Sequence, residues 1–285
     1  MLEFLGPYSR TGPKSVTVMK MGIKWYGKGP RKNESGEIGN SNKTKTAGYT
    51  PSRKTVLAAG LFYLGVIVFG IIAQITRMGL IEPEDATATF ENIIASGGML
   101  EIAFASDILS QTCFILLGLT CYLIFRKVNN LGAVVMLLFV VIAGIYAFVN
   151  MHHILDAFQL VSGADPLMAD EVLAHLNMHE EGTNLANIIG WGPWLIPLGY
   201  LGFKSNFFPK KIGIILMLGG IGLTLQGLQY FLSPSMGDLL TPLIVLSMVA
   251  EFTTCGWFFY RGLKGFDGAV EKERKVDPSD ADAMM

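Results

Sequence analysis

The stretch LGAVVMLLFVVIAGIYAFVNMHH, residues 131–153, contains no Asp, Glu, Lys or Arg. A helix needs about 20 apolar residues to cross the roughly 30 Å hydrocarbon core of a bilayer. The sequence contains five more such stretches, which are broken only by isolated polar residues. They occupy residues 55–75, 103–125, 183–203, 212–232 and 239–260. No barrel-type alternation is present, and backbone groups in lipid must be satisfied internally, so the sequence predicts an all-α bundle of six transmembrane helices.

The composition supports a membrane protein and argues against a soluble domain. Hydrophobic residues make up 51% of the chain and charged residues only 16%. The charges are also segregated along the sequence, whereas a soluble domain of this length spreads them over its surface.

The basic residues predict the orientation. Of the 22 Lys and Arg residues, 21 lie before the first span, between the second and third, between the fourth and fifth, or after the sixth. Arg77 alone falls on the other side, where acidic residues are common. By the positive-inside rule, both termini are expected in the cytoplasm of a cell-membrane protein.

The two ends of the chain differ from the spans. Residues 1–54 are basic, rich in Gly, Lys, Asn and Ser, and lack the apolar segment of a signal peptide. We expect them to form a disordered cytoplasmic tail, and residues 263–285 to form a shorter one. The basic charges are dispersed, so a nucleic-acid partner is not expected.

Two segments resemble a known family. They are WGPWLIPLGYLGFKSNFFPKKIGIILMLGGIG, residues 191–222, and SDILSQTCFILLGLTCYLIF, residues 106–125, with an acidic residue, Glu251, in the last span. The pattern is similar to the family catalogued as domain of unknown function 4386. The resemblance implies about six membrane helices and no established activity.

The first of these segments also has a physical interpretation. Pro193 and Pro197 each remove a helical hydrogen bond and predict a kink. Glycines 219, 220 and 222 predict close approach of a neighbouring helix. Phe207 and Phe208 are expected at headgroup level in a tight cytoplasmic turn.

Polar side chains inside the spans suggest a site, because each is costly in lipid without a partner or water. Most of them fall in one layer near the outer ends of their helices, and a pocket open to the outside is one interpretation. Hydrogen bonding between packed helices is the other. The candidates are Asp107, Gln111, Asn150, Asn187, Gln226 and Gln229, with Glu251 deeper in the last span.

The four histidines of the chain lie close together in the sequence. His152 and Asp156 are spaced i, i+4. A second helix is expected near residues 165–179, with Asp165 as N-cap and Pro166 at its first position. On that helix Met168, Val172 and Leu176 form an apolar stripe, which His175 and His179 extend inward.

Two helices that present such pairs predict a candidate site for a divalent ion such as zinc, with His152, Asp156, His175 and His179 as ligands. The spacing lacks the glutamate of an HExxH motif, so the expectation is that no cofactor is bound.

Two functions therefore remain open. The first is a non-catalytic membrane protein that binds or passes a small solute or lipid through the outer pocket. The second is a membrane-embedded metal-dependent hydrolase that uses His152, Asp156, His175 and His179 to activate water. The lipid bilayer is the expected environment in both cases.

Overall fold

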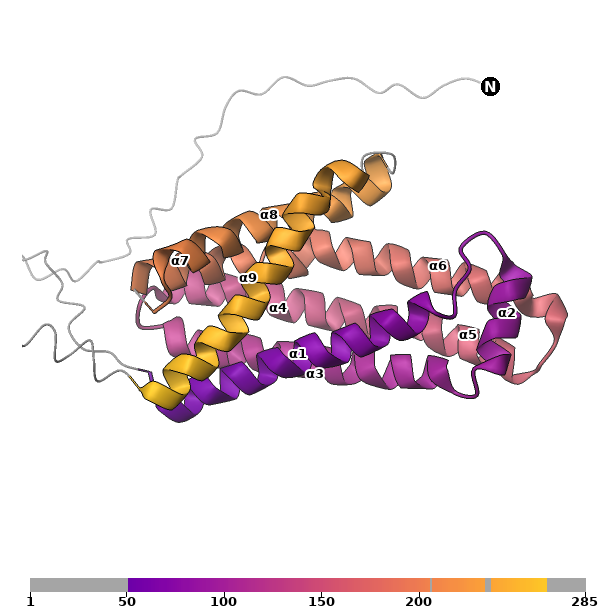
Figure 1. Cartoon of the computed structure of the whole chain (residues 1–285), viewed down its shortest axis with the longest axis horizontal. Helices are drawn as coiled ribbons and strands as arrows, with labels where there is room; N and C mark the ends of the chain where they lie inside the picture. The colour runs from indigo at the N-terminus through magenta and orange to yellow at the C-terminus, as the bar shows by residue number, and fades with distance from the viewer. Residues whose placement is uncertain (1–50, 206, 234–236, 266–285) are drawn as a thin grey trace, which may run out of the picture. The chain divides into compact units, whose positions relative to one another are not determined.

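A computed structural model of the chain describes residues 51–205, 207–233 and 237–265, and these residues form helices without strands (Figure 1). Most of the two predicted tails, residues 1–50 and 266–285, lies outside the described residues. The helices in chain order are α1 (Arg53–Met78), α2 (Ala86–Ala95), α3 (Met99–Phe125), α4 (Asn130–Asn150), α5 (His152–Ser162), η1 (Pro166–Met168), α6 (Ala169–Ala186), η2 (Asn187–Trp191), α7 (Leu195–Ser205), α8 (Lys210–Leu232) and α9 (Gly237–Lys264).

Five helical segments in the described part of the chain are long and apolar enough to cross a membrane. Four are α1, α3, α8 and α9. The fifth joins α4 and α5 into Asn130–Ser162, a run of 33 residues. At 1.5 Å per residue this run is about 50 Å long, and the hydrocarbon core is about 30 Å thick. One end of the run therefore extends beyond the hydrocarbon.

The described helices bury two separate hydrophobic cores. The larger one lies among the long helices and includes Leu117, Val140 and Leu198. The smaller one lies among α2, α5 and α6, at the end of the bundle where Asp85 caps α2 by accepting from the Ala88 amide at 2.8 Å. Its buried members are Leu80, Phe90, Ile93, Leu100, Ile154, Ala157, Ala169, Val172 and Leu176.

The start of α6 follows the local sequence signals. The Asp165 carboxylate accepts from the Leu167 amide at 3.0 Å, and Pro166 occupies the first helical position. Val172 and Leu176 are buried. The predicted N-cap and the inward direction of the apolar stripe are therefore confirmed.

Between α6 and α7 the helix widens into a π-helical turn, η2. The Gly192 amide donates to the Asn187 carbonyl at 3.1 Å, an i→i+5 bond, and Pro193 follows directly. Figure 1 shows α6 continuing toward α7 alongside α4. The kink predicted near Pro193 thus coincides with a π-helix, a common cause of kinks.

Glycines hold α8 against its neighbours. A Cβ atom added to Gly220 would lie 2.7 Å from the Gly192 carbonyl oxygen, and one added to Gly219 would lie 2.8 Å from the Ser247 Cα. At Gly222 an added Cβ would lie 2.7 Å from the Leu243 Cβ. The predicted close approach is confirmed, and it involves both η2 and α9.

Phe207 and Phe208 face the interior of the helix bundle. Both side chains are buried, with exposed fractions of 5% and 2%. The rings pack edge-on against Phe125 and Phe258, and the indole of Trp257 donates to the Phe207 carbonyl at 2.7 Å. Burial of these two large rings stabilises the helix ends that meet here.

Candidate functional site

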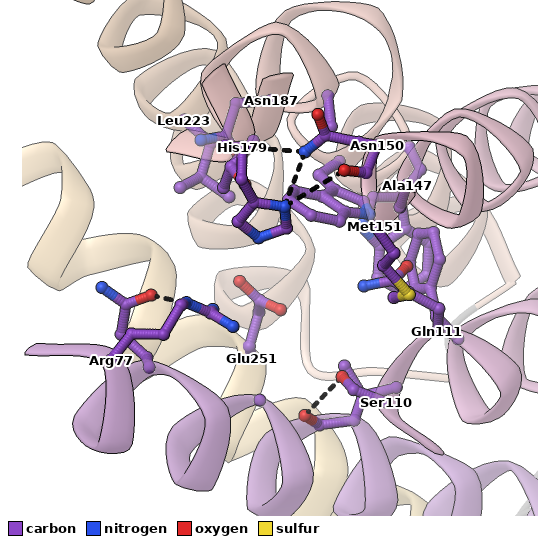
Figure 2. A pocket seen from close by; sticks show the side chains of 18 residues that line it. Arg77, Ser110, Gln111, Ala147, Asn150, Met151, His179, Asn187, Leu223 and Glu251 are labelled. Carbon is purple, nitrogen blue, oxygen red and sulfur yellow. Dashed lines mark hydrogen bonds between the residues drawn. The ribbon is translucent and has the colours of Figure 1, made fainter. Parts of the chain in front are cut away.

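A cavity of about 260 Å³ lies between the helices. Residues from α1, α3, α4, α6, η2, α8 and α9 line it. Figure 2 shows charged and amide side chains from several of these helices directed toward a common space. The size is just below the roughly 300–1,000 Å³ typical of small-molecule sites.

Arg77, in the last turn of α1, supplies the positive charge of the cavity wall. Its guanidinium forms an ion pair with Asp107 on α3, and the two side chains are only 13% and 12% exposed. Asp107 is not among the lining residues. The carboxylate that the sequence placed at the centre of a pocket is therefore held by Arg77 behind the wall, and the guanidinium faces the cavity instead.

Asn150 and His179 join α4 to α6 at the cavity. The Asn150 side-chain amide donates to the His179 carbonyl at 2.9 Å and lies 3.2 Å from the imidazole Nδ1. Gly182 makes room for it, because an added Cβ there would lie 1.9 Å from the Asn150 Oδ1. Burial, together with the positive charge of Arg77, lowers the pKa of His179 to about 4. His179 is therefore a neutral hydrogen-bonding group at pH 7.

Glu251, on α9, supplies an acidic group. Its carboxylate accepts from the Ser247 hydroxyl at 3.1 Å and from the Tyr63 hydroxyl at 3.4 Å. In Figure 2 the Arg77 side chain extends toward Glu251, and His179 lies on another side of the same space. Trp191 and Trp194 complete the wall with apolar rings. Ionisable groups this far inside membrane helices usually mark a functional pathway or site.

The remaining predicted pocket residues separate into two groups. Gln111 and Asn187 line the cavity with Asn150 and Glu251. The buried Gln111 Oε1 has no hydrogen-bond partner among the residues that the structure describes. Gln226 and Gln229 do not line the cavity; both are partly buried, and the Gln229 amide donates to the Ser233 carbonyl at 3.1 Å.

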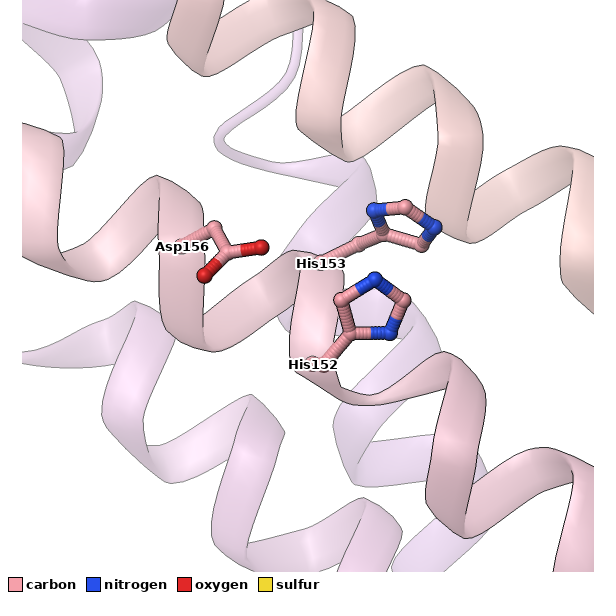
Figure 3. Close-up of side chains that lie close together, drawn as sticks. All are labelled: His152, His153 and Asp156. Carbon is pink, nitrogen blue, oxygen red and sulfur yellow. The ribbon is translucent and has the colours of Figure 1, made fainter.

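The histidines do not form one group. His179 belongs to the cavity wall, whereas His152 and Asp156 lie at the start of α5 with His153 (Figure 3). Ligand atoms of His152, His153 and Asp156 all lie within 4.8 Å of one another. His175 approaches from α6, with its Nδ1 3.7 Å from the Asp156 Oδ2.

Two residues of these clusters were missed by the sequence argument. Arg77 could have been found, because it is the only basic residue predicted on the outer side and so the only cationic partner there for Asp107. His153 could not be separated from His152 by spacing alone, since adjacent residues on a helix point about 100° apart. The packing of α5 against α6 is what brings His153 beside His175.

Five apolar helices of membrane-spanning length, packed around buried polar groups, define a multi-pass integral membrane protein. The family model described as "Domain of unknown function (DUF4386)" matches residues 58–262, and the chain belongs to this family. The resemblance noted in residues 106–125 and 191–222 is thereby confirmed. No curated protein and no solved structure matches the chain.

Proposed function

We propose that this is a cell-membrane protein with six spans and cytoplasmic termini, which binds or passes a small polar solute through the cavity described above. The observation that carries the proposal is the presence of Arg77 and Glu251, a basic and an acidic side chain, on the wall of one cavity between apolar helices. Keeping both groups there is costly in lipid unless they serve a polar occupant or water.

The sixth span would be residues 183–203, formed by the end of α6, η2 and most of α7. This segment contains no charged residue. The positions of the first and last spanning helices support an even number of crossings: the Arg53 Nε donates to the Gly262 carbonyl at 3.2 Å, so the start of α1 lies beside the end of α9. Five crossings would place these two ends on opposite sides of the bilayer.

Basic residues support the assignment of sides. Lys and Arg residues occur at the start of α1, after α3, around the α7–α8 turn and at the end of α9, and Arg77 is the exception at the other end. Arg77 pairs with Asp107 inside the bundle, so it contributes little to the charge of the outer surface. The bias therefore supports a cytoplasmic location for the described helix ends that carry Arg53 and Lys264.

The chemistry of the wall indicates the kind of occupant. Glu251 would attract a cationic or donor group, and the guanidinium of Arg77 would attract a carboxylate or another acceptor. The Gln111 Oε1, which has no partner in the described part of the chain, can accept a hydrogen bond. A zwitterion or a similarly small polar solute fits about 260 Å³, whereas a lipid with two acyl chains is too large.

Thiol labelling tests both the cavity and its orientation. In a parent chain with Cys113 and Cys255 replaced by Ala, the retained Cys121 is fully buried and does not line the cavity, so it gives the background. Ala147→Cys places a thiol on the cavity wall, and Leu167→Cys places one at a site that is 84% exposed. A small charged methanethiosulfonate should label both from outside intact cells, and Ala147→Cys more slowly.

Two results would contradict the proposal. If Ala147→Cys stays unreactive in folded protein while Leu167→Cys reacts, the polar layer is sealed and serves helix packing. If Leu167→Cys reacts only after permeabilisation, the orientation is reversed.

Solute binding is tested with the same two variants. A panel of small zwitterions should slow the labelling of Ala147→Cys but not that of Leu167→Cys, and Glu251→Gln should weaken this protection.

A further inference from the structure

A second group of chemically competent side chains lies apart from the cavity, where α5 packs against α6. It consists of His152, His153 and Asp156 on α5 and His175 on α6. His153 and His175 face each other with their Nδ1 atoms 3.5 Å apart, and the His175 Nδ1 lies 3.7 Å from the Asp156 Oδ2. Figure 3 shows the three α5 residues on one side of the helix.

These distances fit a shared cation better than they fit direct hydrogen bonds. Normal N–H···N and N–H···O bonds are near 3.0 Å, and 3.5 and 3.7 Å are at or beyond the useful limit. Four ligands at about 2.0–2.1 Å from a tetrahedral zinc ion lie about 3.3 Å from one another. The His153–His175 and His175–Asp156 separations are close to this edge length, and ligand atoms of His152, His153 and Asp156 lie within 4.8 Å of one another, so side-chain movements would complete the coordination.

His152 is already oriented as a metal ligand. Its Nδ1 lies 2.6 Å from the Val149 carbonyl oxygen, which can only accept, so Nδ1 carries the proton. In the neutral form of the ring the lone pair is then on Nε2, and in Figure 3 one ring nitrogen of His152 points toward His153. Metal-binding histidines usually donate their other N–H to a carbonyl in this way.

The surroundings also suit a cation. The His175 and Asp156 side chains are 27% and 41% exposed, which leaves an entry path from solvent. Imidazole with one carboxylate is a ligand set that suits zinc, and tetrahedral sites of His and Asp ligands are common for this ion.

We infer that His152, His153, Asp156 and His175 form a binding site for a divalent transition-metal ion of the zinc class. The ion would link α5 to α6 through ligands from both helices. His179, which sequence spacing included in the ligand set, is replaced by His153, because the His179 imidazole Nδ1 lies 3.2 Å from the Asn150 side-chain nitrogen in the cavity wall. This site does not depend on the proposed solute function.

Metal uptake tests the inference directly. Full-length protein, purified without a histidine tag and stripped with a chelator, would be equilibrated with micromolar zinc and measured by elemental analysis and competitive chelator titration. The chain has four histidines: three belong to the proposed site and the fourth is His179. Few variants are therefore needed to identify the zinc ligands. We expect one zinc ion per chain, a raised Tm with zinc, and a tetrahedral visible spectrum when cobalt is substituted.

Variants locate the site. His153→Ala and His175→Ala should each weaken binding by at least the roughly 10–100-fold that outer-shell changes cost at metal sites. Asp156→Asn, at a more exposed position, serves if either alanine variant fails to fold. His179→Gln is the matched control and should bind zinc like the parent.

The inference is overturned if folded parent protein takes up no zinc under these conditions. It is overturned equally if the His153, His175 and Asp156 variants bind as tightly as the parent, or if His179→Gln loses zinc to the same degree as they do.

Discussion

Breaking the ion pair between Arg77 and Asp107 should destabilise the bundle near the cavity, because it leaves one buried charge without a partner. Both side chains are nearly buried, at 13% and 12% exposed. Arg77→Gln keeps most of the side-chain length but leaves the Asp107 carboxylate without its counter-ion. Breaking a buried pair in this way costs about 3–5 kcal/mol. Water in the adjacent cavity would relieve part of the loss, so we expect the lower end, about 3 kcal/mol.

Thermal unfolding of detergent-purified protein measures this loss. One kcal/mol corresponds to roughly 2–4 °C in Tm for domains of 150–250 residues, so Arg77→Gln should lower Tm by about 6–12 °C. The double variant Arg77→Gln with Asp107→Asn should recover most of it, because two neutral amides can hydrogen-bond to each other without a buried charge. Arg126→Gln, at an exposed position after α3, is the control and should leave Tm unchanged.

The double-mutant cycle decides whether the reasoning holds. If Arg77→Gln and Asp107→Asn each change Tm by no more than Arg126→Gln does, the ion pair makes no net contribution. If the two single losses simply add in the double variant, the groups are not coupled and the buried-charge argument is refuted.

Two further predictions concern packing and pH. Gly202→Ala should destabilise the protein by about 1–3 kcal/mol through overpacking, because the new methyl would lie 1.8 Å from the Phe208 ring; Gly256→Ala, where nothing lies within 4 Å, should not, and equal Tm values for the two would contradict this account. Since burial lowers the pKa of His179 to about 4, its stabilising contribution is complete above the unfolded-state pKa near 6.5 and is lost as pH falls toward 4; Tm measured between pH 7 and 4 should fall less steeply in His179→Gln, and parallel profiles would refute the assignment.

The lengths of the apolar stretches predict most of the fold because the bilayer imposes one length on every span. Residues 131–153 and 212–232 correspond closely to α4 and α8 on this basis. The structure of residues 183–203 was harder to predict, because this stretch is formed by parts of α6, η2 and α7. Its irregular centre depends on contacts with α4 and α8, which no local sequence pattern encodes.

The residues of the candidate site are harder to predict from the sequence than the helices are. Counting residues gives the depth of a side chain along its helix, but it does not give the direction in which the side chain points around the helix axis. Counting residues placed Gln226 in the same layer as Asn187, yet only Asn187 lines the cavity. Burial of Phe207 and Phe208 was missed for a related reason: aromatic residues beside lysines suit the headgroup region equally well, and only the space above Gly202 accommodates Phe208 in the core.

The π-helical turn η2 has a consequence for how insertions and deletions can occur in this protein. A turn closed by i→i+5 bonds holds one residue more than the α-helical turn it replaces. Removing one residue between Asn187 and Trp191 would convert the wide turn into an α-helical one and let α6 and α7 keep their present faces, with Pro193 still between them. The same deletion inside α4 or α8 would rotate every later side chain by about 100° and turn buried faces toward lipid. Length variation within the spanning helices should therefore be tolerated at η2 before it is tolerated in α4 or α8.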